Sequence, residues 1–302
     1  MAKNDELREF LRTRRARLQP EDVGIETAGQ RRVPGLRREE VAMLAGVSVD
    51  YYVRLEQGRD LQPSDSVLDA VARALRLAPA EREYLHNLVR AAAPSTSPEQ
   101  PYPVRPPVPA GVRAILDTLG VPGVLVDFRG DVLATNRLAR ALVADFDAMP
   151  EAERNHSRWL FLDPAARERF VDWEMVARGS IAVIRDAAGR YPHDAALHAR
   201  IGELSVASRE FRTWWAMHDV GSRRNGTKRF RHPVVGELEV QYQALKVDGM
   251  EAWIYAHDVE PGSRSEEALR LLATWAATED AEAARADQIR RTPRAPARRL
   301  AD

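Results

Sequence analysis

The chain has 302 residues, a formal net charge of zero from 45 basic and 45 acidic residues, and no cysteine. This length suits two domains, and the missing cysteines exclude a disulfide framework and a cysteine-ligated zinc site. No apolar run approaches the roughly 20 residues of a membrane span and the first ten residues are too polar for a secretory signal, so we expect a cytoplasmic protein without membrane contact.

Residues 1–92 predict an all-α domain of five short helices. Apolar residues recur at helical spacing within 7–18, 38–57, 64–75 and 79–89, with Gly- and Pro-containing connections between them. Arginines crowd the first helix and the approach to the second: Arg8, Arg12, Arg14, Arg15, Arg17, Arg31, Arg32, Arg37 and Arg38. Because charge distribution matters more than the total, a net charge of zero does not exclude a polyanionic partner such as DNA.

The segment 38–57 has the pattern of a helix-turn-helix. Ala42 stands where two helices approach closely, Gly46 follows at a sharp turn, and Ser48 offers an N-cap for the second helix. The remaining residues of the second helix form an outer face that can enter a major groove: Val49, Asp50, Tyr51, Val53, Arg54 and Gln57. This combination predicts a DNA-binding domain.

Individual roles follow from side-chain chemistry. Arg54 can reach guanine or a phosphate through its two-pronged guanidinium, and Arg37 and Arg38 are placed to bind phosphates. Val49 and Tyr51 can touch thymine methyl groups. The alternative for each arginine is a solvated charge on a helix surface.

Seven prolines interrupt the segment 93–109. Proline removes a backbone donor and disfavours helix for the preceding residue, so this stretch predicts a semi-rigid linker between two domains.

Residues 110–276 predict an α+β domain with an antiparallel sheet. Short strands are expected at 124–126 and 132–135, a helix from Asn136 and several more helices up to Trp215. Strands resume at 238–243 and 253–255, and a helix over 265–278 closes the domain. With no regular alternation of strand and helix, the helices are expected on one face of the sheet. Residues 277–302 predict a basic, disordered tail.

All six tryptophans follow the linker, at positions 159, 173, 214, 215, 253 and 275. Ordinary core packing accounts for any one of them, whereas the set favours an apolar ligand cavity. Neighbouring pairs such as His218-Asp219 do not form a catalytic dyad by sequence alone, because adjacent side chains point in different directions. With no recognised catalytic or metal motif, we expect neither an enzyme nor a metal site.

Two resemblances rest on these residues. The segment 36–59 resembles the phage-repressor (Cro-type, or XRE) helix-turn-helix family, although Arg38 stands where many members carry glutamine. Residues 109–272 are similar to the MmyB-like regulator ligand-binding domain, above all at 158–164, 211–220 and 226–238. This second resemblance implies a PAS-like sensor fold with a cavity for a fatty-acid-like ligand. Many members carry tryptophan before the asparagine that starts the first helix, where this chain has Thr135.

Together these observations predict a homodimeric regulator that reads DNA and responds to a hydrophobic effector, with no other cofactor. The expected cavity residues are Trp159, Phe161, Trp173, Phe211, Trp214 and Trp215, and a carboxylate head group is expected near His218, Arg223 or Lys228. One alternative is a second domain that only dimerises or recruits a protein, and another is an enzyme fused to a DNA reader.

Overall fold

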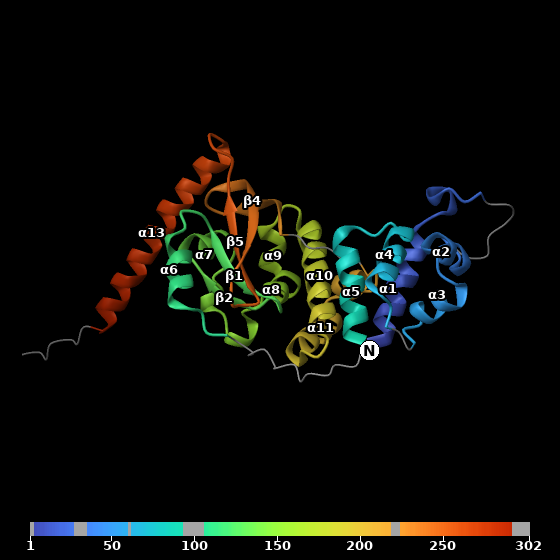
Figure 1. Ribbon diagram of the computed structural model, residues 1–302. Helices are drawn as coiled ribbons and strands as arrows, with labels where there is room; N and C mark the ends of the chain where they lie inside the picture. The colour runs from blue at the N-terminus through green and yellow to red at the C-terminus, as the bar shows by residue number, and fades with distance from the viewer. Residues whose placement is uncertain (1–2, 27–34, 60–61, 93–105, 219–223, 292–302) are drawn as a thin grey trace, which may run out of the picture.

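The computed structural model describes residues 3–26, 35–59, 62–92, 106–218 and 224–291. These residues form two bodies side by side, a helical one up to residue 92 and a mixed one from residue 106 (Figure 1). Most of the predicted linker at 93–109 lies outside the described residues. No helix in the described part of the chain is long and apolar enough to cross a membrane.

The helical body contains the five predicted α-helices. They are α1 (Lys3–Arg17), α2 (Arg38–Ala45), α3 (Val49–Glu56), α4 (Asp65–Ala74) and α5 (Pro79–Ala92), with a 3-10 helix at Pro20–Val23. Gly46 ends α2 with a φ of 68°, a left-handed conformation that favours glycine, and so makes the sharp turn into α3 possible. All five helices meet in one core that includes Phe10, Tyr52 and Tyr84.

A five-stranded antiparallel sheet organises the second body. Its strands are β1 (Gly123–Asp127), β2 (Val132–Thr135), β3 (Asn225–His232), β4 (Gly236–Lys246) and β5 (Ala252–Asp258), in the order β2-β1-β5-β4-β3. Along β4, Leu238, Val240 and Tyr242 are buried and the residues between them are exposed, as the alternating sequence predicts. The predicted α+β class with an antiparallel sheet is confirmed.

Helices cover both faces of this sheet. Between β2 and β3 lie α7 (Arg137–Leu142), α8 (His156–Leu162), α9 (Pro164–Arg169), α10 (Trp173–Arg190), α11 (Ala195–Ala207) and α12 (Arg209–Trp215), with 3-10 helices at Phe146–Ala148 and Glu151–Glu153. The structure also contains a helix that the sequence pattern did not predict, α6 (Ala110–Thr118). Leu116 of α6 packs against Leu125 and Ala134 on the second face, so the expectation of helices on one face alone was wrong.

The C-terminal helix is longer than predicted. It runs as α13 (Arg264–Arg291) and extends away from the sheet (Figure 1). Residues 277–291, which were predicted to be disordered, are therefore helical. Alanine, glutamate and arginine dominate this stretch, and all three are strong helix formers. Residues 292–302 lie outside the described part of the chain.

The spacing of Phe170, Trp173 and Val176 is helical and would place Phe170 in one helix with α10, but α10 begins only at Trp173. Phe170 ends α9 in an extended conformation and forms a bridge with Phe230 of β3. Its buried ring packs on Phe230, with centroids 4.7 Å apart. Tertiary packing thus overrides the local helical spacing.

Candidate functional site

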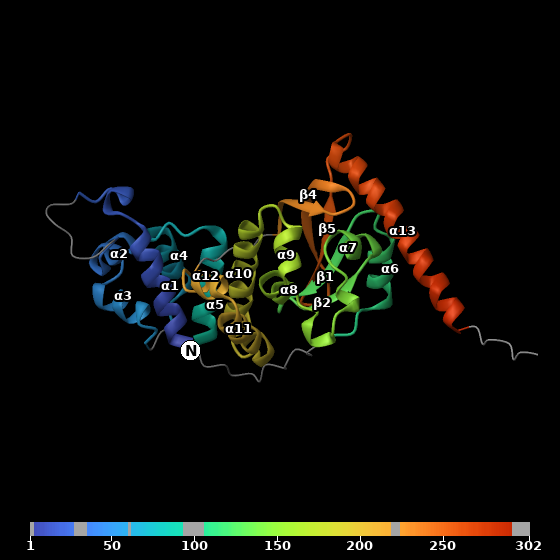
Figure 2. The same ribbon diagram turned by 180° about the vertical axis from the view of Figure 1, so that it is seen from behind.

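The α3 helix lies at the end of the helical body that is far from the sheet (Figures 1 and 2). The Ser48 hydroxyl accepts a hydrogen bond from the Tyr51 backbone N–H at 3.1 Å and caps the helix. Tyr52 and Leu55 are fully buried and fix the inner face. Val49 and Asp50 are exposed, which leaves the outer face available to a large partner.

Arg54 keeps half of its side-chain surface exposed and lies 3.4 Å from Asp50, one helical turn earlier. Such an exposed pair contributes little to stability, so Arg54 can exchange it for a base or a phosphate. Tyr51, Val53 and Gln57 are half-buried beside it.

Arg38 makes a contact that the sequence did not indicate. Its Nε donates to Oε2 of Glu56, a fully buried carboxylate at the end of α3, and this hydrogen bond raises the pKa of Arg38. Arg15 of α1 donates to Oε1 of the same carboxylate at 3.0 Å. Glu56 therefore ties α1, α2 and α3 together, and Arg38 has a structural role whether or not it also reaches a phosphate.

Arg37 is the N-cap residue of α2, and its backbone N–H donates to Glu40 at 2.6 Å. On the Arg37 side this contact uses only the backbone N–H and does not involve the guanidinium.

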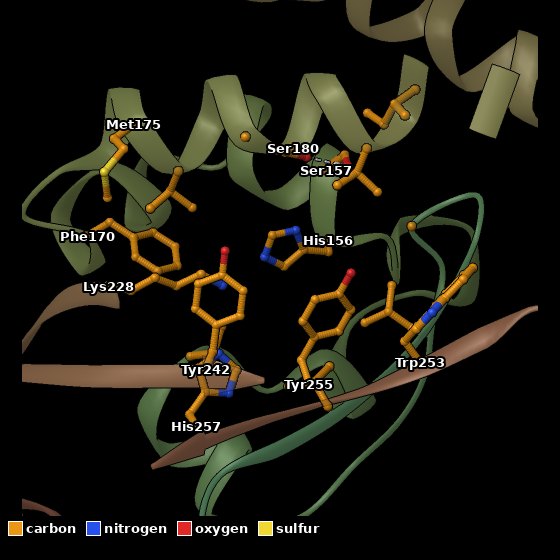
Figure 3. Close-up of a pocket in the computed structure, with 18 of the residues that line it drawn as sticks. His156, Ser157, Phe170, Met175, Ser180, Lys228, Tyr242, Trp253, Tyr255 and His257 are labelled. Carbon is orange, nitrogen blue, oxygen red and sulfur yellow. Dashed lines mark hydrogen bonds between the residues drawn. The ribbon is translucent and has the colours of Figure 1, made fainter. Parts of the chain in front are cut away.

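A cavity of about 110 Å³ lies in the second body between the sheet and helices α8 and α10. Its walls come from Val124 and Val126 of β1, from β3–β5 and from one side of α10, which is drawn above the strands in Figure 3. The larger apolar lining residues are Phe128, Phe170, Met175, Val176, Ile184, Phe230 and Trp253. This mostly apolar lining suits a hydrophobic ligand.

A few polar groups enter this cavity. Figure 3 shows the side chains of His156, Lys228, Tyr242 and Tyr255 directed into the space below α10. The Lys228 ammonium lies 4.3 Å from the centroid of the Tyr242 ring, within range of a cation–π interaction. Ser157 and Ser180 pair with each other, with their hydroxyl oxygens 2.9 Å apart.

Burial controls the charges in the cavity. Loss of solvent, together with a smaller effect of nearby Lys228, lowers the pKa of His156 to about 3. The same two causes lower the pKa of His257 to about 3. Burial and neighbouring Asp131 raise the pKa of Asp127, at the end of β1, to about 7. Near neutral pH both histidines are therefore uncharged, while Lys228 supplies positive charge to the described lining.

Comparisons with protein families agree with this architecture. A model of the MmyB-like transcription regulator ligand binding domain matches residues 108–272, and a model of a helix-turn-helix domain matches residues 6–85. The chain belongs to the MmyB-like transcription regulators. None of the curated proteins compared with it matches. This MmyB-like regulator thus joins a helix-turn-helix DNA-binding domain to a ligand-binding domain, as the sequence predicts.

Of the residues predicted to contact the ligand, Lys228 lines the cavity of this MmyB-like regulator. Arg223 lies outside the described residues. The predicted aromatic residues pack elsewhere. Trp159 contacts Phe146 and Phe170, with ring centroids 5.7 and 5.9 Å away, and Phe161 lies 5.1 Å from Phe211. These aromatic side chains therefore pack in the core of the second body, which was the alternative to lining the cavity.

The other predicted residues lie at the start of α10 and on or just after α12. Trp173, Trp214 and Trp215 are partly buried around α10 and α12. His218 Nδ1 accepts a hydrogen bond from Arg185 Nη1 at 3.1 Å, and burial and Arg185 lower the pKa of His218 to about 4. An uncharged histidine between the two bodies cannot serve as the cationic contact for a carboxylate in the cavity.

The sequence contained a signal for the residues that do line the cavity. Buried and exposed residues alternate with a period of two at the end of β3 and along most of β4, which places Phe230 and Tyr242 on the covered side of the sheet. This strand alternation is a better guide to the cavity than the tryptophan count.

Proposed function

We propose that the cavity binds a fatty-acid-like carboxylate and that this effector controls DNA binding. Lys228 supports the assignment, because it brings a positive charge into a cavity whose walls are mostly apolar. The ligand carboxylate would pair with the Lys228 ammonium, and the neutral His156 ring or the Tyr242 and Tyr255 hydroxyls would donate hydrogen bonds to it. The acyl chain would lie along Val176 and Ile184 of α10.

The cavity volume limits the ligand. At about 110 Å³ it is smaller than an engineered cavity of about 150 Å³ that holds benzene. A long acyl chain therefore needs additional space. Met175 lines the cavity and is 38% exposed, so its flexible side chain can move aside and let the chain extend toward the surface.

A direct test uses native mass spectrometry of the full-length protein before and after organic extraction, followed by thermal unfolding with added dodecanoate. We expect removable mass or a rise in melting temperature, since a ligand bound only by the folded state stabilises it. Lys228→Met should weaken dodecanoate binding by about 10-fold or more, as expected for loss of a charged hydrogen bond worth about 1.5–3 kcal/mol.

Arg231→Met is the matched control. Arg231 lies on the same strand, is exposed and pairs with Glu237 at 2.9 Å on the solvent side. Its removal should leave dodecanoate binding unchanged. If extraction removes no mass and no fatty acid shifts the melting temperature, the second domain only dimerises or recruits a protein.

The second domain would bind its ligand without catalysing a reaction. The Ser157 and Ser180 hydroxyls pair with each other rather than with a histidine base, and the lowered pKa of His156 makes it a weak base. Turnover that disappears in a His156→Gln variant that still folds would contradict this assignment.

The DNA-bound form is proposed to be a homodimer. Two copies of α3 would enter successive major grooves about 34–36 Å apart and read two half-sites. Light scattering on the protein with duplexes that carry one or two half-sites tests this stoichiometry. One protein chain on a two-site duplex at saturation would exclude the dimer.

A further inference from the structure

The α10 helix is shared by the cavity and the interface between the two bodies. Val176, Gly179 and Ile184 line the cavity (Figure 3 shows this helix above it). On another side of the same helix, Gly189 lies against α5 of the helical body, and both views show α10 beside α5 (Figures 1 and 2). Any displacement of α10 by a ligand therefore acts on the DNA-binding domain.

Arg185 follows Ile184 directly and is fully buried between the two bodies. Its Nη1 lies 3.4 Å from Glu6 Oε1 of α1 and 3.1 Å from His218 Nδ1, and its guanidinium stacks on Trp215 at 4.0 Å. Glu6 also accepts a hydrogen bond from the Tyr84 hydroxyl at 2.8 Å. Because breaking a buried charge pair is costly, this cluster resists sliding and moves as a unit.

The contact between α10 and α5 leaves no free space. A Cβ atom built on Gly189 would lie 2.6 Å from Cε2 of Tyr84, so the ring rests directly on the α10 backbone. Closely packed interfaces change between discrete arrangements and do not deform gradually. A shift of α10 is therefore passed to α5 and α1.

The α1 helix continues this path to the recognition helix. Arg14 pairs with Glu81 of α5 at 2.8 Å and donates to the His218 carbonyl, so α1 is also attached to the loop after α12. The next residue, Arg15, donates to Glu56 at 3.0 Å, and Glu56 is the last residue of α3. One rigid helix thus contacts the α10 interface and α3.

We propose that α10, through its Arg185–Glu6 and Gly189–Tyr84 contacts, transmits occupation of the cavity to the orientation of α3. The inference rests on the proposed ligand function. An acyl chain that lies along Val176 and Ile184 and extends past Met175 would push α10 outward at Ile184, and the adjacent Arg185 would then displace Glu6 and α1. Arg185, Glu6 and Gly189 are positioning residues for this coupling and contact neither ligand nor DNA.

Gly189→Ala tests the coupling at one atom. Alanine favours helix over glycine, so α10 itself is not weakened, but the added methyl group separates α10 from Tyr84. Gly202→Ala on α11 is the matched control, because its Cβ would meet nothing within 4 Å. Both variants are made in the full-length protein.

Hydrogen–deuterium exchange with and without dodecanoate provides the first readout. In the wild type and in Gly202→Ala, dodecanoate should change exchange in α10, α1 and α3. In Gly189→Ala, dodecanoate should still bind and change exchange in α10, with no change in α1 or α3. The second readout is the affinity of each protein for a DNA duplex that was selected with the ligand-free protein. Dodecanoate should change this affinity about 5-fold or more in the wild type and in Gly202→Ala, but not in Gly189→Ala.

Three results would overturn the inference. If dodecanoate binds to the wild type but changes exchange only within residues 106–291, the cavity is a binding site without this coupling. Gly189→Ala with wild-type coupling shows that the α10–α5 contact is not the path. No dodecanoate binding at all removes both the coupling and the proposed function. If Gly189→Ala fails to fold, Glu6→Ala, which removes an acceptor and adds no atom, must give the same uncoupling.

Discussion

Arg54 combines exposure with a position in the middle of the outer face of α3. Its only described ionic partner is the exposed Asp50, at 3.4 Å, so little stability depends on its side chain. A loss of DNA affinity on changing Arg54 therefore reports on recognition and not on folding.

Arg54→Ala is expected to cost about 1–3 kcal/mol of binding free energy and to relax preference at one base position. Binding to wild-type-selected duplexes with single base changes measures both effects. Arg113→Ala, an exposed arginine on α6, should change neither. Retained affinity and base preference in Arg54→Ala would assign recognition to a residue other than Arg54.

His257 gives the stability a pH dependence of known sign. Its folded-state pKa of about 3 lies below the ordinary value of 6.5, so between these pH values the unfolded chain binds a proton that the folded chain does not. Acid therefore destabilises the fold through His257. Relative to His257→Gln, the wild type should lose up to about 1.4 kcal/mol of unfolding free energy per pH unit below pH ~6.5.

Urea unfolding of both proteins at several pH values between 4.5 and 7 measures this difference. The comparison with the variant matters, because the raised pKa of Asp127 contributes a slope of opposite sign in the same range. Parallel curves for the two proteins would mean that His257 is protonated normally in the fold.

At the scale of single residues, the sequence identified exposed side chains better than buried ones. The outer face of α3 follows from helical spacing alone. The ligand residues depend on which face of each element meets the cavity, and on α8 the first turn faces it while Trp159 and Phe161 pack into the core. Composition cannot distinguish these two places, since both favour aromatic side chains.

Among the elements, α13 shows how a helix divides into an attached and an exposed part. Leu272 is fully buried against the sheet, whereas the neighbouring Leu271 is 65% exposed. Beyond residue 277, the side chains that the structure describes are exposed. The first part of α13 therefore stabilises the domain and the second part does not.

Leu272→Ala is expected to lower the unfolding free energy by about 2–5 kcal/mol because it leaves a cavity in the core. Leu271→Ala should change it by no more than about 0.5 kcal/mol, and removal of residues 281–302 should have a similarly small effect. Chemical denaturation of the three variants measures these values. A large loss from the truncation would show that the end of α13 packs on another part of the protein or on a second copy.

The boundaries of some helices are set by tertiary packing and not by the local sequence pattern. Apolar residues at helical spacing predicted most helices, and helix propensity would have extended α13 to Arg291. At Phe170, by contrast, the helical stripe was misleading, because bridging to Phe230 places the ring in the core. Only a contact distant in sequence decides that break.

In the whole molecule, the contacts of α10 with α1 and α5 join the two bodies. These contacts include the buried Arg185 cluster and an ion pair of 2.8 Å between Arg190 and Glu83. All six tryptophans belong to the second body. Tryptophan fluorescence therefore follows that body alone, while circular dichroism follows both.

Fluorescence and circular dichroism should give coincident urea transitions for the wild type, because the interface couples the unfolding of the two bodies. Gly189→Ala should separate the two transitions, and Gly202→Ala should leave them together. Separate transitions in the wild type would mean that the interface is too weak to join the bodies.

The helix-turn-helix, the outer face of α3, the α+β class and the family can all be derived from the amino-acid sequence, because they depend on local spacing, capping and alternation. The lining of the cavity, the burial of Glu56 beneath Arg38 and the position of α10 beside both the cavity and the DNA-binding domain follow only from the folded chain. Each of these depends on contacts between segments far apart in the chain, such as Glu6 with Arg185. Local periodicity holds no information about such contacts.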